Sequence, residues 1–223
     1  MSIRDKNLVL DEYYHIYNRG NDKKEIFLDE EDYDRFTKLL YVCNSKNNFV
    51  FRDSVIRNKI NAFDFEKGDP LVSILGWVLM PNHFHIILVS HRSDLCKNNY
   101  NPITEFMRKV STAYVMYFNK KYNRTGSLFE GKFKSKHIAE ENYFHYIFSY
   151  VHLNPIKLIQ KDWKEKGISD KNKSRIFLTN YKYSSFQDYF GKERNIGKIL
   201  NKEMIPVYLI FNNIDDLFKH INL

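Results

Sequence analysis

Four stretches of the chain carry the hydrophobic and polar patterns that are typical of strands. Residues 13–18 combine aromatic and β-branched side chains and end at a polar Asn-Arg-Gly-Asn turn. The apolar runs 71–79 and 83–90 are separated by only three residues, which favours an antiparallel pair. Residues 128–139 alternate apolar and basic side chains, which predicts a strand with a basic face. Residues 49–51 fit a further, short strand.

Three longer stretches predict helices. Asp29 is a good N-cap for a helix over 30–43, and Asn101 followed by a proline begins a second helix that runs to about residue 121. A third helix begins near Glu140 and is closed by an Asn-Pro pair. Helices placed between antiparallel strands in this order predict an α+β fold, a ferredoxin-like two-layer sandwich.

The last part of the chain has a different pattern. Residues 160–173 are strongly charged and predict a linker or long loop, whereas 181–191 and 204–223 have partly helical patterns. We therefore expect a first domain over 1–159 and a C-terminal extension over 160–223 that packs on it.

The amino-acid composition indicates what kind of partner the protein binds and in which cellular compartment it is expected. The net charge is +8, and 16% of the residues are aromatic. A basic, tyrosine-rich chain favours a polyanionic partner, nucleic acid first, although simple solubility charge is the plainer alternative. Cys43 and Cys96 form no Cys-x-x-Cys pair, which excludes a cysteine zinc site. The polar N-terminus and the lack of a long apolar run predict a cytoplasmic protein with no membrane contact.

The first candidate for chemistry is a His-x-His triplet at the start of the strand over 83–90. Successive side chains of a strand alternate between faces, so His83 and His85 should point the same way and Phe84 the opposite way. Two adjacent imidazoles can hold a divalent metal ion. The triplet alone is weak evidence, because histidines occur at this spacing by chance.

The second candidate lies on the helix that precedes the Asn-Pro pair. Tyr143, Tyr146 and Tyr150 recur at helical spacing, and Tyr150 and Asn154 are neighbours one turn apart. A tyrosine hydroxyl can attack a phosphodiester if a metal ion polarises the phosphate, and an asparagine oxygen can complete a metal site. We interpret Tyr143 and Tyr146 as core residues whose hydroxyls reach solvent.

Together these segments resemble the REP-associated tyrosine transposases, which belong to the HUH single-strand DNA nucleases with one catalytic tyrosine. The resemblance covers residues 13–157, with a weaker echo at 183–186. Glu130 stands where the family commonly has Gln, and residues 44–70 and the tail show no family pattern. The matching segments are Tyr14-His15-Ile16-Tyr17-Asn18-Arg19-Gly20, Trp77 with Met80-Pro81-Asn82-His83-Phe84-His85, Gly126-Ser127-Leu128-Phe129-Glu130-Gly131-Lys132-Phe133-Lys134, and Tyr150-Val151-His152-Leu153-Asn154-Pro155.

The resemblance implies a mechanism and a set of site residues. Tyr150 would attack single-stranded DNA and form a 5′-phosphotyrosine bond, which a second 3′-hydroxyl can reverse without an external energy source. His83, His85 and Asn154 would bind the metal, Mg²⁺ or Mn²⁺; zinc is the second choice, since no fourth protein ligand is evident. His15 is expected to support a ligand rather than bind the ion, with DNA contact as the alternative.

The expected substrate is single-stranded or hairpin DNA. Smaller relatives are dimers that share the tyrosine helix, whereas the long tail here favours a monomer, so both states stay open. The alternatives are a domesticated protein that binds hairpin DNA or RNA without cutting, and a replication-initiation or relaxase nuclease. The residues expected to contact DNA are Asn18, Arg19, Arg124, Lys132, Lys134 and Lys136.

Overall fold

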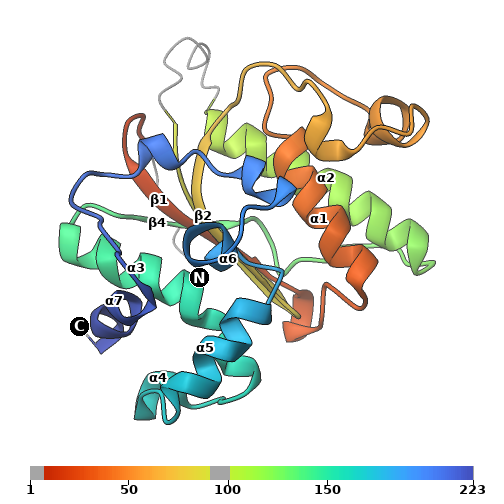
Figure 1. Cartoon of the computed structure of the whole chain (residues 1–223). Coiled ribbons are helices and arrows are strands. Elements are labelled where there is room, and N and C mark those ends of the chain that lie inside the picture. Colours follow the sequence, from red (N-terminus) through yellow and green to blue (C-terminus); the bar gives the residue numbers. More distant parts are fainter. Residues whose placement is uncertain (1–7, 91–100, 223) are drawn as a thin grey trace.

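A computed structural model describes residues 8–90 and 101–222 of the chain; Cys96 and the first seven residues lie outside this description. A four-stranded antiparallel sheet forms the centre (Figure 1), with the strand order β2-β3-β1-β4. The helices and the antiparallel sheet confirm the predicted α+β, ferredoxin-like class. The strands are β1 (Tyr13–Arg19), β2 (Ser73–Met80), β3 (His83–Val89) and β4 (Lys134–His137).

One face of the sheet is covered by α1 (Glu30–Val42) and α2 (Pro102–Lys121). Their N-caps are those predicted. The Asp29 side chain accepts a hydrogen bond from the Asp32 backbone N–H, and the Asn101 side chain accepts one from Thr104, each at 3.1 Å. The apolar sides of both helices pack against the β3 side chains that face away from His83 and His85.

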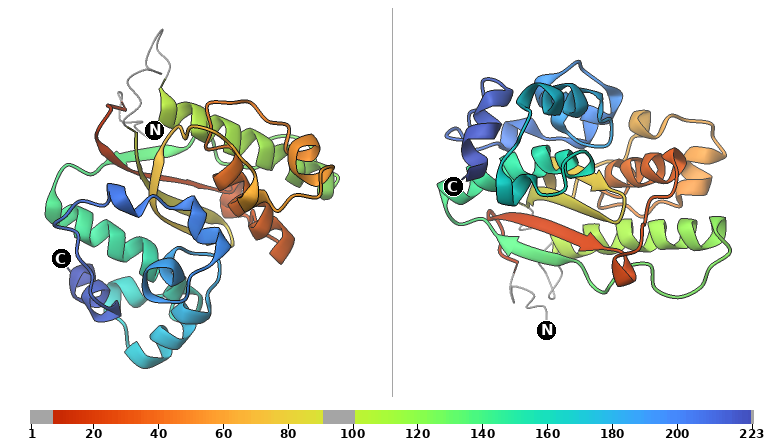
Figure 2. Two further views of the ribbon diagram at one scale, coloured as in Figure 1. Left: turned by 45° about the horizontal axis from the view of Figure 1, so that its top comes forward. Right: turned by 90° about the horizontal axis from the view of Figure 1, so that it is seen from below.

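The other face is covered by α3 (Glu141–Leu153) and by the elements after it (Figure 2, right). Because helices cover both faces of the sheet, the protein has three layers. The sheet with α1 and α2 makes two of them, as in the predicted two-layer sandwich, and α3 with the elements after it adds the third. The helices of this outer layer are α3, α4 (Trp163–Lys166), α5 (Lys171–Asn180), α6 (Phe186–Phe190) and α7 (Ile214–Lys219). None of the helices within residues 8–90 and 101–222 combines the length and the hydropathy of a membrane-spanning segment.

Residues after α3 also pair with the outer edge of β2. Ser185 N–H donates to the Trp77 carbonyl and Leu79 N–H donates to the Tyr183 carbonyl, both at 2.9 Å. These bonds satisfy an edge that would otherwise expose unpaired backbone groups. The extension is therefore hydrogen-bonded to the sheet itself, and the predicted division at residue 160 stays a prediction.

Three local predictions differ from the structure. Residues 160–173 are not a linker, because α4 and the start of α5 lie there and Trp163 is buried. Residues 49–51 form no strand. Of the predicted strand over 128–139, only Lys134–His137 forms the regular strand β4; outside it, Glu130 N–H donates to the Arg19 carbonyl and Ile138 N–H donates to the Tyr13 carbonyl. The alternating pattern before β4 arises because Phe129 and Phe133 are core residues of a loop.

His152 joins α3 to the extension inside the core. Its side chain is fully buried; Nδ1 donates to the Phe148 carbonyl and Nε2 accepts from the Ser185 hydroxyl, both at 2.8 Å. A Cβ added at Gly76 on β2 would lie only 3.2 Å from His152 Cε1. A side chain at position 76 would therefore crowd the imidazole, and His152 acts as a structural residue that joins α3 to the extension.

Candidate active site

The His-x-His triplet lies at the beginning of β3, on the face that α3 covers. His83 and His85 share this face with Ile87 and Val89, whereas Phe84 points into the core beneath α1 and α2. The alternation predicted from the sequence is therefore present. On the neighbouring strand, Tyr17 is the register partner of His85.

Hydrogen bonds at Nδ1 orient both imidazoles. His83 Nδ1 donates to Asn82 Oδ1 at 2.6 Å, and His85 Nδ1 lies 2.8 Å from His15 Nε2. With the proton of His85 on Nδ1, its Nε2 presents a lone pair, and this buried atom has no hydrogen-bond partner. The two rings lie 5.0 Å apart between centroids and nearly perpendicular. Each is thus held with Nε2 available as a ligand.

The tyrosine helix closes over this pair within the same chain. The Tyr150 ring lies 5.3 Å from the His85 ring, edge to face. Packing fixes this orientation, because Phe144, Phe148 and Val151 on other sides of α3 are buried. The proximity of Tyr150 to the histidines therefore needs no exchange of helices between subunits.

Asn154 begins the 3₁₀ turn that follows α3 and is 1% exposed. Its side chain is near enough to His83 and Tyr150 to affect the pKa of each, yet its Oδ1 makes no hydrogen bond of ordinary geometry. A buried amide oxygen without a donor is costly, and such an atom is explained when an ion or ligand completes it.

Burial sets the ionisation of the cluster. It lowers the pKa of His15 to about 3 and of His83 to about 4, and it holds the pKa of His85 well below its usual value; nearby lysines add to the effect. The imidazoles are neutral at neutral pH and keep their lone pairs. Burial raises the pKa of Tyr150, which Lys164 and Asn154 partly oppose.

A metal ion fits this donor set. In residues 8–90 and 101–222, no three His, Cys, Asp or Glu side chains come close enough together to hold a metal ion. The third ligand expected from the sequence is an amide oxygen, and Asn154 Oδ1 is a buried oxygen without a hydrogen-bond partner near His83. Imidazole and amide donors suit Mn²⁺ and leave positions open for phosphate oxygens. The ligand assignment stays a prediction.

Some predicted DNA contacts lie beside the cluster. Lys134 and Lys136 on β4 are the register partners of Tyr17 and His15, so they share the histidine face. Arg19 pairs with His83 across the sheet, but its guanidinium is held by the Glu130 carboxylate, with Nη2 and Oε1 at 2.8 Å. Lys134 Nζ lies 3.8 Å from the same carboxylate. Arg19, Lys134 and Lys136 form a basic margin along one side of the site, in which Glu130 offsets part of the charge of the first two.

Other predicted contacts lie on the opposite face. Asn18 is 3% exposed and its Nδ2 donates to the Gly131 carbonyl at 3.0 Å, so it fastens the loop before β4 rather than facing DNA. Lys132 lines a cavity of about 330 Å³ beside α2, and Arg124 lies over the Phe118 ring. The structure does not bring these three residues to the histidine cluster.

Three residues beside the cluster carry no motif in the sequence and become evident only in the structure. Lys157 acts on the pKa values of both His83 and His85. The Trp163 ring stacks nearly parallel to Tyr150 at 6.3 Å, and Lys164 Nζ lies 4.2 Å from the centre of the Tyr150 ring. The one available signal was a tryptophan within a charged segment, which is typical of an anchored rather than a free stretch.

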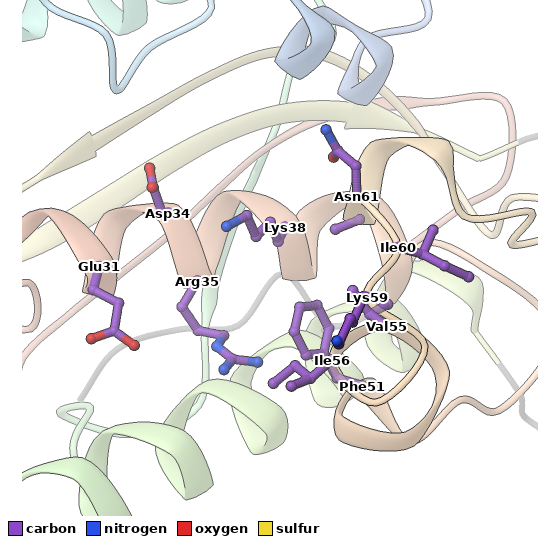
Figure 3. Close-up of a pocket in the computed structure, with 11 residues that line it drawn as sticks. Glu31, Asp34, Arg35, Lys38, Phe51, Val55, Ile56, Lys59, Ile60 and Asn61 are labelled. Carbon is purple, nitrogen blue, oxygen red and sulfur yellow. The ribbon is translucent and has the colours of Figure 1, made fainter.

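A separate cavity of about 520 Å³ lies between α1 and the segment over residues 51–62 (Figure 3). Glu31, Asp34 and Arg35 line it from the α1 side, and the guanidinium of Arg35 lies over the Phe51 ring at 4.3 Å. No residue of the histidine and tyrosine cluster lines this cavity.

Comparisons with known proteins find a likeness in fold. No family model matches the chain, and no curated protein matches it. A solved structure of a REP-associated tyrosine transposase bound to a REP hairpin is similar, with a TM-score of 0.50, 13% sequence identity and 84% of each chain covered. At this identity the likeness shows a shared α+β fold and a distant structural relationship.

Proposed function

We propose that this protein is a metal-dependent single-strand DNA transposase or endonuclease that acts next to a hairpin and uses Tyr150 as its nucleophile. The observation that carries the proposal is the contact of Tyr150 with His85 in one chain, beside two buried polar atoms that have no partner. The similar transposase structure, bound to a hairpin, supports hairpin DNA as the ligand.

In this proposal His83, His85 and Asn154 hold Mg²⁺ or Mn²⁺. When bound, such an ion supplies Lewis-acid polarisation of the phosphate and neutralises charge in the transition state. His15 keeps the His85 ring turned so that Nε2 points away from β1.

Tyr150 carries out the chemical step. Its pKa is raised by burial, so the phenol is protonated at neutral pH and loses its proton during the attack. The phenolic oxygen forms a bond to phosphorus while the bond from phosphorus to the 3′-oxygen breaks. The phenol releases one proton and the departing 3′-oxygen takes one up. The product is a 5′-phosphotyrosine, which another 3′-hydroxyl can attack to rejoin the strands.

The basic margin supports binding of the strand. Lys134 and Lys136 extend the positive face along β4, and the half-buried rings of Tyr143, Tyr146 and Tyr150 follow one another 6.1 Å apart along α3. Lysines that track phosphates and aromatic rings that stack on unpaired bases are the usual parts of single-strand binding sites.

The experiment uses a hairpin oligonucleotide with single-stranded flanks and a label at its 3′ end. With Mn²⁺, a labelled covalent species should migrate with the protein on a denaturing gel. Tyr150→Phe should abolish it, while Tyr146→Phe, one turn away on the same helix, should retain it. Tight binding of the hairpin without any product would favour the non-cleaving alternative and contradict the proposal.

A further inference from the structure

Helix α4 of the extension forms one wall of the candidate active site. Trp163 is 2% exposed and lies parallel to Tyr150. The helix has only four residues, but the Gln160 side chain holds the loop after it, donating to the Gly167 carbonyl at 2.8 Å and accepting from Ser169 N–H at 3.0 Å. The buried Trp163 anchors the short helix, and the Gln160 bonds hold the loop that follows it.

That residue is Lys164, whose ammonium lies over the Tyr150 ring although the side chain is exposed to solvent. In the described parts of the chain no carboxylate pairs with it. Lys166, on the same helix, differs in this respect, because its Nζ lies 2.8 Å from Asp162 Oδ2. Lys164 thus carries an uncompensated charge next to the proposed nucleophile.

The charged side chains that act on the histidines and on Tyr150 are positive. Lys164 acts on the pKa of His15, His85 and Tyr150, and Lys157 acts on those of His83 and His85. The two lysines therefore approach the cluster from the extension and from the turn after α3. Positive charge on two sides of the Tyr150 ring and the histidine pair favours an anionic ligand between them.

We propose that Lys164 binds a non-bridging oxygen of the phosphate that Tyr150 attacks, so that the C-terminal extension completes the active site. The inference rests on the proposed function and names one more substrate contact for it. A phosphate that reaches the Tyr150 hydroxyl comes within the range of the lysine side chain, which is long, flexible and held over the same ring. Lys164 then exchanges a weak contact with the aromatic face for a charge-assisted hydrogen bond.

The test compares Lys164→Met and Lys164→Arg with the matched control Lys166→Met. Without metal, binding of the single-strand-flanked hairpin is titrated at several salt concentrations. Loss of one phosphate contact should reduce the slope of log K against log salt by about 0.7 in Lys164→Met. The control and Lys164→Arg should keep the wild-type slope.

The second readout is the rate of adduct formation in a single turnover with saturating DNA and Mn²⁺. Lys164→Met should be slower by about 100-fold, as when a group that stabilises transition-state charge is removed, with partial recovery in Lys164→Arg. An unchanged salt slope together with a rate within about twofold of wild type would overturn the role of Lys164. Absence of any adduct in the wild type would instead contradict the proposed function, and the salt titration would still decide the phosphate contact.

Discussion

Acid is expected to destabilise the folded protein, because several histidines are buried in the neutral form. His152 is the histidine to test, since it is fully buried and is not a member of the proposed metal site. Burial lowers the pKa of His152 from 6.5 to about 4. The unfolded chain takes up its proton near pH 6.5, so the stabilisation is complete above that pH and is lost as the pH falls toward 4. A shift of about 2.5 units at about 1.36 kcal/mol per unit corresponds to about 3 kcal/mol for this one side chain.

The assay is urea unfolding between pH 7.5 and 4.5. The variant His152→Gln has no imidazole to titrate at this position. As the pH is lowered, the free energy of unfolding should therefore decrease less in the variant than in the wild type, and the two slopes should differ by about 1.4 kcal/mol per pH unit. Ser185→Ala is the matched control, because it removes a hydrogen bond to the same imidazole and leaves the histidine buried. Because Ser185 Oγ also accepts from the Trp77 N–H, the variant should lower the stability by about 1–3 kcal/mol at every pH and keep the wild-type slope. Equal slopes for His152→Gln and the wild type would show that the His152 imidazole does not cause the loss of stability in acid.

Three further predictions follow from contacts in and around the site. Millimolar Mn²⁺ should raise the melting temperature of the wild type, and His83→Ala and His85→Ala should each abolish the rise; a rise that persists in both variants contradicts the metal site. Gly76→Ala should cost about 1–3 kcal/mol in urea unfolding, because the new Cβ meets His152 at 3.2 Å, and an unchanged stability would show that the strand relaxes freely. Glu130→Gln should release Arg19 and Lys134 from the carboxylate that they share, tighten hairpin binding and steepen the salt slope by about 0.7 for each cation that then binds a phosphate; an unchanged slope would show that neither cation gains a phosphate contact.

The sequence correctly predicted the features that depend on neighbouring residues alone, such as helix N-caps and the alternation of side chains along a strand. The N-caps Asp29 and Asn101 were correct because each cap is decided within one helical turn. The shared face of His83 and His85 followed from the alternation of a strand. The strand predicted over 128–139 was mostly wrong, since Phe129 and Phe133 reach the core from a loop, and an alternating pattern does not distinguish the two cases.

The site needed information that local rules lack. Period and spacing made His83 and His85 neighbours and made Tyr150 and Asn154 neighbours, but only tertiary packing brings the two pairs together; the family resemblance supplied that step as an expectation. Lys164 was missed because it is near Tyr150 only through the docking of a four-residue helix. Asn18 was expected to face DNA, and its place on β1 instead turns it toward the opposite face.

The most direct test of the central claim is to locate the covalent bond. After reaction with the hairpin oligonucleotide and Mn²⁺, the adduct is trimmed with nuclease and trypsin and sequenced by mass spectrometry. The peptide over residues 137–157 holds Tyr143, Tyr146 and Tyr150, so fragmentation distinguishes them. A 5′-linked nucleotide should be found on Tyr150 alone. A nucleotide on another residue, or cleaved DNA with no nucleotide on the protein, would contradict the role of Tyr150 as the nucleophile.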